Sequence, residues 1–302
     1  MTGTGQLPPT PRPRSRRRKL DPAYLVMVVP AVALFTFFLV APALMGAFFS
    51  VTNYAGYGDW EFIGVGNYTA MLDDPAIVES YAFTFFLAVT AVIVVNVSAI
   101  LIALGLNAKI KWRSGLRTVF FIPMVLSAIV IAYVFNYLFS TSLPTLAESV
   151  GLTPLASSIL ANEQWAWVAV LFVTAWQAIP GATIIYLAGL QSIPGEVYEA
   201  AYLDGAGMWR RFLSITFPLV IGYVVINVIL GFKGFLGAYE IILALTDGGP
   251  GTATTTVAMR IFSGFNGGDY AYQMANSIVF FAITVVISLL QLRFLQRRGM
   301  TL

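Results

Sequence analysis

Few residues of this 302-residue chain have side chains suited to chemistry. The sequence contains no histidine and no cysteine, which removes the commonest metal ligand and general base together with thiolate nucleophiles, disulfides and iron–sulfur ligation. Within the long apolar stretches one carboxylate stands out, Glu240, which follows Lys233 by seven residues. On a continuous helix this spacing places both side chains on one face, two turns apart. We therefore expect no catalytic residue and no metal site, and these two charges are the first candidates for a functional role.

The elements that must position these residues are membrane helices. Apolar residues make up 58% of the chain and charged residues 10%, whereas a soluble domain has roughly 45–50% and about 25%. Stretches of about 20 apolar residues span a bilayer. The sequence predicts an all-α integral membrane protein with six transmembrane helices at 24–50, 81–107, 118–140, 165–190, 218–245 and 272–292.

The distribution of charge along the chain predicts its topology. Fifteen of the seventeen Lys and Arg residues lie before the first predicted span, after the second, after the fourth or after the last. The other loops carry nine acidic residues and one basic residue, Arg260. By the positive-inside rule we expect a multi-pass protein with both termini in the cytoplasm. Residues 1–22 are expected to form a disordered basic cytoplasmic tail, and residues 23–302 the membrane domain.

The polar loop at 191–217 has a helical pattern of its own. Pro194 is typical of a helix start, and Gly205 with Gly207 should separate a first short amphipathic helix from a second one containing Met208, Phe212 and Ile215. The small pair Ala200–Ala201 permits close approach by another surface, and Glu199 offers a charge to a basic partner residue. From these residues alone, a helix lying flat in the lipid headgroups or a loop packed on itself remain alternatives.

At this loop the sequence resembles a known family. Glu199-Ala200-Ala201, Gly205, Ile215 and Pro218 are similar to the signature of permease subunits of binding-protein-dependent ABC importers. Two further segments resemble the maltose-type, carbohydrate-importing branch: 62–68, and 245–250 followed by the threonines at 254–256. The resemblance implies that the loop docks on an ATPase subunit, with these coupling residues: Glu199, Ala200, Ala201, Asp204, Gly205, Arg210, Ile215 and Pro218.

The resemblance also implies partners and a location. The expected partners are a second homologous permease, two ATPase subunits, an extracytoplasmic solute-binding protein and membrane lipid, with no nucleic acid, in a bacterial cytoplasmic (inner) membrane. The chain has no Gly-x-x-x-x-Gly-Lys-Ser/Thr phosphate loop, so it cannot itself hydrolyse ATP. We expect it to bind no cofactor, while ATP and Mg are used by the partner ATPase.

The expected function is to form half of the translocation path for a sugar or oligosaccharide delivered by the binding protein. An isolated charge at mid-membrane costs at least ~2.5–3.5 kcal/mol, so Lys233 and Glu240 are expected to face the bundle interior or an aqueous cavity. Gly234 and Gly237 could permit local unwinding there. The full set of candidate path residues is Lys233, Tyr239, Glu240, Asn136, Tyr137, Asn227 and Asn276.

Alternatives to these roles stay open at this stage. Asparagine is also ordinary glue between membrane helices, and Lys233 and Glu240 could contact the partner permease or reach toward an interface. The substrate could instead be glycerol phosphate or another polyol. A secondary transporter would usually show several buried acids or histidines, and a membrane-embedded enzyme would need a nucleophile with a base, a metal site or paired aspartates.

Overall fold

The computed structural model describes residues 22–108, 111–152 and 156–297. In these ranges the chain is helical and contains no strand, only an isolated bridge between Thr52 and Phe62. The chain divides into two compact units, residues 1–46 and 47–302, which we describe separately. The basic tail predicted for residues 1–22 lies, apart from Pro22, outside the described residues.

The first unit contains one apolar helix. It begins with α1 (Pro22–Phe35), continues through the π-helical segment η1 (Thr36–Val40) and enters α2 (Ala41–Phe49). The uninterrupted helix provides the first candidate span, Val26–Phe49. Pro30 lies within α1 and does not break it, as expected where neighbouring polar groups can satisfy the freed backbone atoms.

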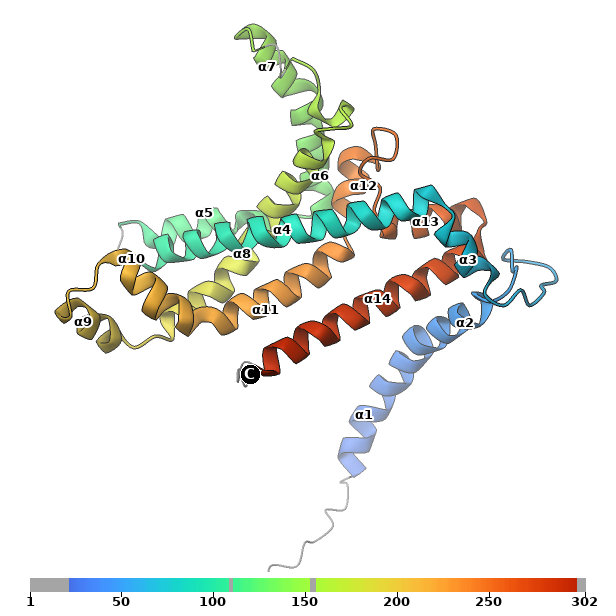
Figure 1. Ribbon diagram of the computed structural model, residues 1–302, viewed down its shortest axis with the longest axis horizontal. Helices are drawn as coiled ribbons and strands as arrows, with labels where there is room; N and C mark the ends of the chain where they lie inside the picture. The colour runs from blue at the N-terminus through green and yellow to red at the C-terminus, as the bar shows by residue number, and fades with distance from the viewer. Residues whose placement is uncertain (1–21, 109–110, 153–155, 298–302) are drawn as a thin grey trace, which may run out of the picture. The chain divides into compact units, whose positions relative to one another are not determined.

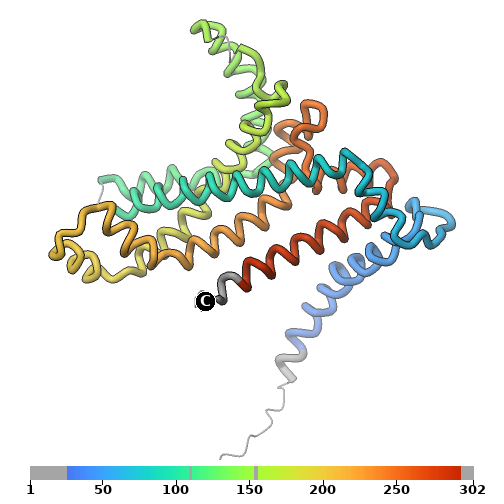
Figure 2. Tube along the Cα trace, viewed as in Figure 1, coloured from blue at the N-terminus to red at the C-terminus, as the bar shows by residue number. Residues whose placement is uncertain are grey.

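The second unit supplies the other spans (Figures 1 and 2). Within the described residues, six helices are long and apolar enough to cross a membrane, which confirms the predicted fold class. The five in this unit are α4 (Pro75–Asn107), the run α6–η2–α7 (Ala128–Ser149), α8 (Ala166–Gln191), the run α10–η5–α11 (Met208–Leu236) and α14 (Tyr270–Arg297).

Short helices lie at the two ends of this bundle. In Figure 1, α9 (Gly195–Leu203) and α10 (Met208–Arg211) lie at one end of α4, and α3 (Gly66–Leu72) and α13 (Val257–Gly267) lie at the other. The 191–217 loop and the acidic loops around α3 and α13 are therefore far apart along the helices. This arrangement is the one that the charge pattern requires.

The third span differs from the prediction of 118–140. Helix α5 (Arg113–Val125) ends at Leu126, whose backbone is extended, and α6 (Ala128–Tyr137) begins after Ser127. The same helix then continues through η2 (Leu138–Ser142) and α7 (Leu143–Ser149). Pro144 does not stop it, because the wider π-helical turn η2 lies directly before it and accommodates the proline ring. Hydropathy alone merged α5 with α6 and ended the span too early.

The fifth span also differs from the predicted 218–245. Helix α11 (Phe217–Leu236) ends with Gly237 as its C-cap, and a separate helix, α12 (Glu240–Thr246), follows. The expectation of local unwinding is confirmed at Gly237. The expectation that Lys233 and Glu240 share a face of one helix is wrong, because the helix is broken between them.

Small side chains let the central helices approach closely. Helix α4 packs mainly against α8 and α11. The core clusters along this contact contain fully buried alanines of α4, Ala88, Ala91, Ala99 and Ala103, beside valines and leucines of the other helices. Small residues at helix contacts are typical of membrane bundles, where van der Waals packing rather than the hydrophobic effect drives association.

Candidate functional site

The 191–217 loop has the predicted helix and glycine turn. Helix α9 ends where the N–H groups of Asp204 and Gly205 donate to the carbonyls of Ala200 and Tyr202, at 3.0 Å each. Gly205 then adopts a φ of +71°, a conformation that favours glycine. The small residue is therefore needed for the turn itself, and α10 begins three residues later.

The second helix of this loop is not a separate element. Helix α10 passes through a π-helical turn, η5 (Phe212–Thr216), directly into α11, so the expected second short helix is the start of the fifth span. In a regular helix the ring of Pro218 would clash with the carbonyl of Ser214. The wider turn lies directly before Pro218 and accommodates it. Figure 2 shows the resulting continuous coil.

Most of the predicted coupling residues are exposed. Ala201 is buried and Ile215 is half-buried, whereas the rest of the set is exposed: Glu199, Ala200, Asp204, Gly205, Arg210 and Pro218. Large apolar side chains are exposed beside them, with Leu203 at 85%, Trp209 at 75% and Tyr202 at 73%. The Tyr198 and Thr216 hydroxyls lie 3.1 Å apart and join α9 to the base of α11. An exposed aromatic and acidic surface on an anchored helix is typical of a protein contact.

A cavity of about 530 Å³ lies at the break between α11 and α12, and we name it the break cavity. Its lining is Met124, Ala128, Thr174, Gln177, Ala178, Gly234, Phe235, Gly237, Ala238, Tyr239, Glu240 and Ile241. The hydroxyl of Thr174 is buried and has no hydrogen-bond partner among the described residues, while the Gln177 amide donates to the Leu126 carbonyl (3.3 Å). The polar side chains of this lining are thus a threonine with a buried hydroxyl, an amide, a phenol and the exposed carboxylate of Glu240.

The threonines that follow α12 hold the break in place. The Thr256 hydroxyl donates to the Ala238 carbonyl (2.9 Å) and accepts from the Met259 N–H at the start of α13 (3.4 Å). Thr254 and Thr255 donate to the carbonyls of Gly249 (2.8 Å) and Gly248 (3.1 Å). The sequence marked these threonines only as part of a family resemblance, and it did not single out Thr174.

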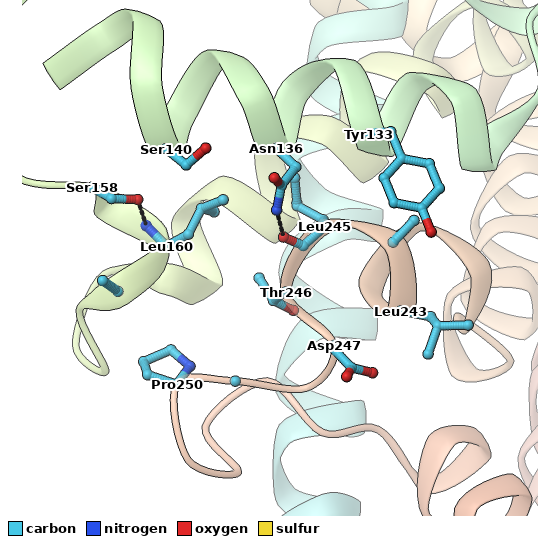
Figure 3. Close-up of a pocket in the computed structure, with 13 residues that line it drawn as sticks. Tyr133, Asn136, Ser140, Ser158, Leu160, Leu243, Leu245, Thr246, Asp247 and Pro250 are labelled. Carbon is cyan, nitrogen blue, oxygen red and sulfur yellow. Dashed lines mark hydrogen bonds between the residues drawn. The ribbon is translucent and has the colours of Figure 1, made fainter. Parts of the chain in front are cut away.

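A third feature, the α6–α12 cavity, has a volume of about 720 Å³ (Figure 3). Tyr133, Asn136 and Ser140 line it from one side, and Leu243 to Thr246 of α12 and the following Asp247 also line it. The Asn136 amide donates to the Leu245 carbonyl (2.6 Å), so Asn136 lines this cavity and also fastens α6 to α12. Tyr137, the next residue, is exposed and is not part of this lining.

The remaining path candidates lie apart from Glu240. Lys233 is exposed and does not line the break cavity. The buried Asn227 amide donates to the Ala182 carbonyl of α8 (3.1 Å). The fully buried Asn276 accepts from the Tyr81 hydroxyl (2.9 Å) and donates to Gln273 (3.2 Å). These two amides join helices, while Tyr239 and Glu240 are the candidates that the structure brings together.

In the described ranges no three acidic side chains gather closely enough to hold a metal ion.

A multi-pass helical bundle with an exposed helix-turn loop and a polar cavity at a helix break defines a membrane transport subunit. Residues 96–298 match the family described as binding-protein-dependent transport system inner membrane component. The chain therefore belongs to this family. It is the permease subunit of an ABC importer, as the 191–217 loop indicated.

The relatives agree with this assignment. The chain is 34% identical, over 88% of its length and 92% of the relative's, to the multiple sugar-binding transport system permease protein MsmF of Streptococcus mutans. It is 30% identical, over 89% and 92%, to the trehalose/maltose transport system permease protein MalF of Thermococcus litoralis. A crystal structure of a bacterial alginate ABC transporter contains a chain of the same fold, with a TM-score of 0.81, 21% identity and coverage of 93% and 96%.

Proposed function

We propose that this chain forms half of the translocation path for an uncharged sugar or oligosaccharide, which an extracytoplasmic solute-binding protein delivers. The break cavity carries this proposal. Its polar lining consists of Thr174, Gln177, Tyr239 and Glu240 together with backbone groups at the break, and its lining contains no basic side chain. Sugar hydroxyls can donate to a carboxylate and accept from an amide or a phenol.

The same lining argues against a phosphorylated substrate. A glycerol phosphate would bring a second negative charge to Glu240 in a partly desolvated cavity, where like charges repel more strongly than in water. Proteins that recognise phosphate usually supply Arg or Lys. A neutral sugar or oligosaccharide therefore fits the cavity better than the alternative of glycerol phosphate, in agreement with the named relatives that transport sugars.

Energy for transport is proposed to come from two partner ATPase subunits, which use ATP and Mg. The exposed surface of α9 and α10 supports this assignment, because Glu199 and Trp209 are free to contact a protein. A second, homologous permease is proposed to complete the path.

We place both termini and the 191–217 loop in the cytoplasm, because basic residues concentrate near them and acidic residues concentrate at the opposite end.

The test is reconstitution of the complete importer with its binding protein in lipid vesicles. ATP hydrolysis is measured with maltose, trehalose, raffinose and glycerol 3-phosphate in turn. The proposal expects stimulation by at least one neutral sugar and none by glycerol 3-phosphate. Stimulation by glycerol 3-phosphate alone would overturn the substrate assignment.

A paired substitution then tests the break cavity. Glu240→Gln should leave the complex assembled but raise the KM for the stimulating sugar, because the amide accepts hydrogen bonds more weakly than the carboxylate. Lys233→Gln is the matched control, since Lys233 lies on the other side of the break and does not line the cavity. Equal effects of both changes, or unchanged kinetics in Glu240→Gln, would remove Glu240 from the path.

A further inference from the structure

A smaller cavity lies between α12 and α13, and we name it the α12–α13 cavity. Its volume is about 360 Å³, within the range of roughly 300–1,000 Å³ usual for small-molecule sites. Tyr239 lines both this cavity and the break cavity. Leu243 and Asp247, four and eight residues further along α12, line both this cavity and the α6–α12 cavity. The α12–α13 cavity therefore adjoins the proposed path on the side where the acidic loops lie.

The lining of this cavity combines an aromatic wall with polar groups. The rings of Tyr239 and Phe262 lie 5.2 Å apart and are tilted by 56°. Asp247, Arg260 and Asn266 add a carboxylate, a guanidinium and an amide. A sugar ring has apolar faces and hydroxyl groups around its edge. An aromatic wall facing a mixed set of donors and acceptors is suited to such a ligand.

Arg260 has hydrogen-bonding capacity that the described chain does not use. Its Nε is buried and donates to no atom of the described residues. Two neighbouring hydroxyls donate to backbone carbonyls, Ser263 to that of Arg260 (3.1 Å) and Thr255 to that of Gly248 (3.1 Å), and neither accepts from the Arg260 Nε. A buried donor without an acceptor is unfavourable. The Arg260 guanidinium therefore has unused donor capacity beside the cavity that Arg260 lines.

The charge around the cavity favours an uncharged ligand. Asp247 lines the same cavity as Arg260, so an anionic ligand would meet a carboxylate and a cationic one a guanidinium. Nine acidic residues and only Arg260 occupy the loops on this side of the chain. A polyhydroxy compound can donate to Asp247 and accept from Arg260 at the same time.

We propose that the α12–α13 cavity is an outer-side binding site for one uncharged sugar unit, which occupies it before it reaches the break cavity. Phe262 and Tyr239 contact the face of the sugar, and Asp247 and Arg260 bind its hydroxyls. Because Tyr239 lines both cavities, it contacts the sugar in both positions. This inference rests on the proposed transport of a sugar and adds a second, earlier site.

The experiment uses the absence of cysteine from the chain. Asn266→Cys places a thiol in the cavity, and Gly267→Cys places one on the next residue of α13, which is exposed and does not line the cavity. Each variant is reconstituted with the partner permease, the ATPase subunits and the binding protein. Labelling by a membrane-impermeant maleimide is followed with no binding protein, with sugar-free binding protein and with binding protein loaded with the sugar that best stimulates ATP hydrolysis.

The expected result is a several-fold slower labelling of position 266 with the sugar-loaded binding protein only, and no change at position 267. Equal slowing by the sugar-free binding protein, equal slowing at both positions, or no slowing at position 266 would each overturn the outer-side site. Failure of the proposed function is distinguishable, because it shows as the lack of any sugar-stimulated ATP hydrolysis in the complex that contains the unsubstituted chain.

A second variant tests the guanidinium without a thiol. Arg260→Gln removes the charge and reduces the N–H donors from five to two. In the assembled complex it should raise the KM for the sugar several-fold while kcat is largely retained. An unchanged KM in a fully assembled complex would exclude Arg260 from sugar binding.

Discussion

Thr256 and Ala238 lie eighteen residues apart in the chain, and the Thr256 hydroxyl donates to the Ala238 carbonyl at 2.9 Å. Ala238 lies in the break between α11 and α12, where the helical partner of its carbonyl is missing. The same hydroxyl caps the start of α13. One side chain thus fixes the position of the break relative to α13, and with it the position of Tyr239 and Glu240.

Replacing Thr256 by Val should loosen the break cavity. The substitution keeps the shape of the side chain but leaves the Ala238 carbonyl unpaired, which typically costs about 1–3 kcal/mol. Because Thr256 acts through Tyr239 and Glu240, we expect the KM for sugar-stimulated ATP hydrolysis to rise more than kcat falls. Thr256→Ser retains the hydroxyl and should restore the KM. A KM that stays unchanged in Thr256→Val would show that the bond does not position the cavity.

Gly189 allows α8 to approach α11 closely. A Cβ atom at this position would lie 2.6–2.9 Å from atoms of the Tyr223 ring, closer than van der Waals contact permits. Gly189→Ala should therefore separate the two helices and destabilise the permease by about 1–3 kcal/mol. Gly222→Ala is the control, because a Cβ there meets nothing within 4 Å. The midpoint of thermal unfolding of the purified complex should fall only in Gly189→Ala, and equal midpoints would contradict the close contact.

Reversing the charge of Glu199 should detach the ATPase subunits. Glu199 is exposed on α9, so Glu199→Lys leaves the membrane helices intact but adds repulsion to a basic partner residue. We expect retention of the ATPase through purification to fall by about tenfold or more, equivalent to about 1.4 kcal/mol. Glu196→Lys makes the same change in charge three residues earlier in the same helix. If both variants lose the ATPase equally, net charge rather than the position of Glu199 controls docking.

The orientation of the chain can be tested by single cysteines in the cysteine-free sequence. Asp59→Cys should react with a membrane-impermeant reagent in intact cells, because it lies in an acidic loop expected outside. Asp204→Cys in the 191–217 loop should react only after the cells are permeabilised. The parent chain, which has no thiol, gives the background. Labelling of position 204 in intact cells without labelling of position 59 would reverse the topology.

The sequence predicted the number of spans, the 191–217 loop and the family, because hydropathy, charge and a short motif are local properties of the chain. It misplaced the end of the fifth span. In the break after α11, the Ala238 carbonyl accepts a hydrogen bond from the hydroxyl of Thr256, a residue far along the chain, instead of from a helical N–H group. No window of apolar residues contains that information. The third span was misplaced for a similar reason, since the break at Leu126–Ser127 falls inside an apolar run.

The candidate site was only partly predictable. Glu240 was singled out because a carboxylate in an apolar stretch is rare. Thr174 was not, because a threonine in a membrane helix usually bonds to its own backbone, as Thr183 does to the Ile179 carbonyl (2.8 Å). Only the folded chain shows that the Thr174 hydroxyl has no partner among the described residues and that Thr174 lines the same cavity as Glu240.

The unbroken helix from Met208 to Leu236 has a mechanical consequence. Its 29 residues correspond to a rod of about 43 Å, longer than the roughly 30 Å of hydrocarbon in a bilayer. One end carries Trp209 beside the exposed surface of α9, and the other end stops at the break cavity. If a partner tilts this helix at its Trp209 end, the end at the break cavity is displaced. The permease can thus act as a lever, in which one rigid element reaches both the proposed ATPase-docking surface and the break cavity, and no relay of side chains is required.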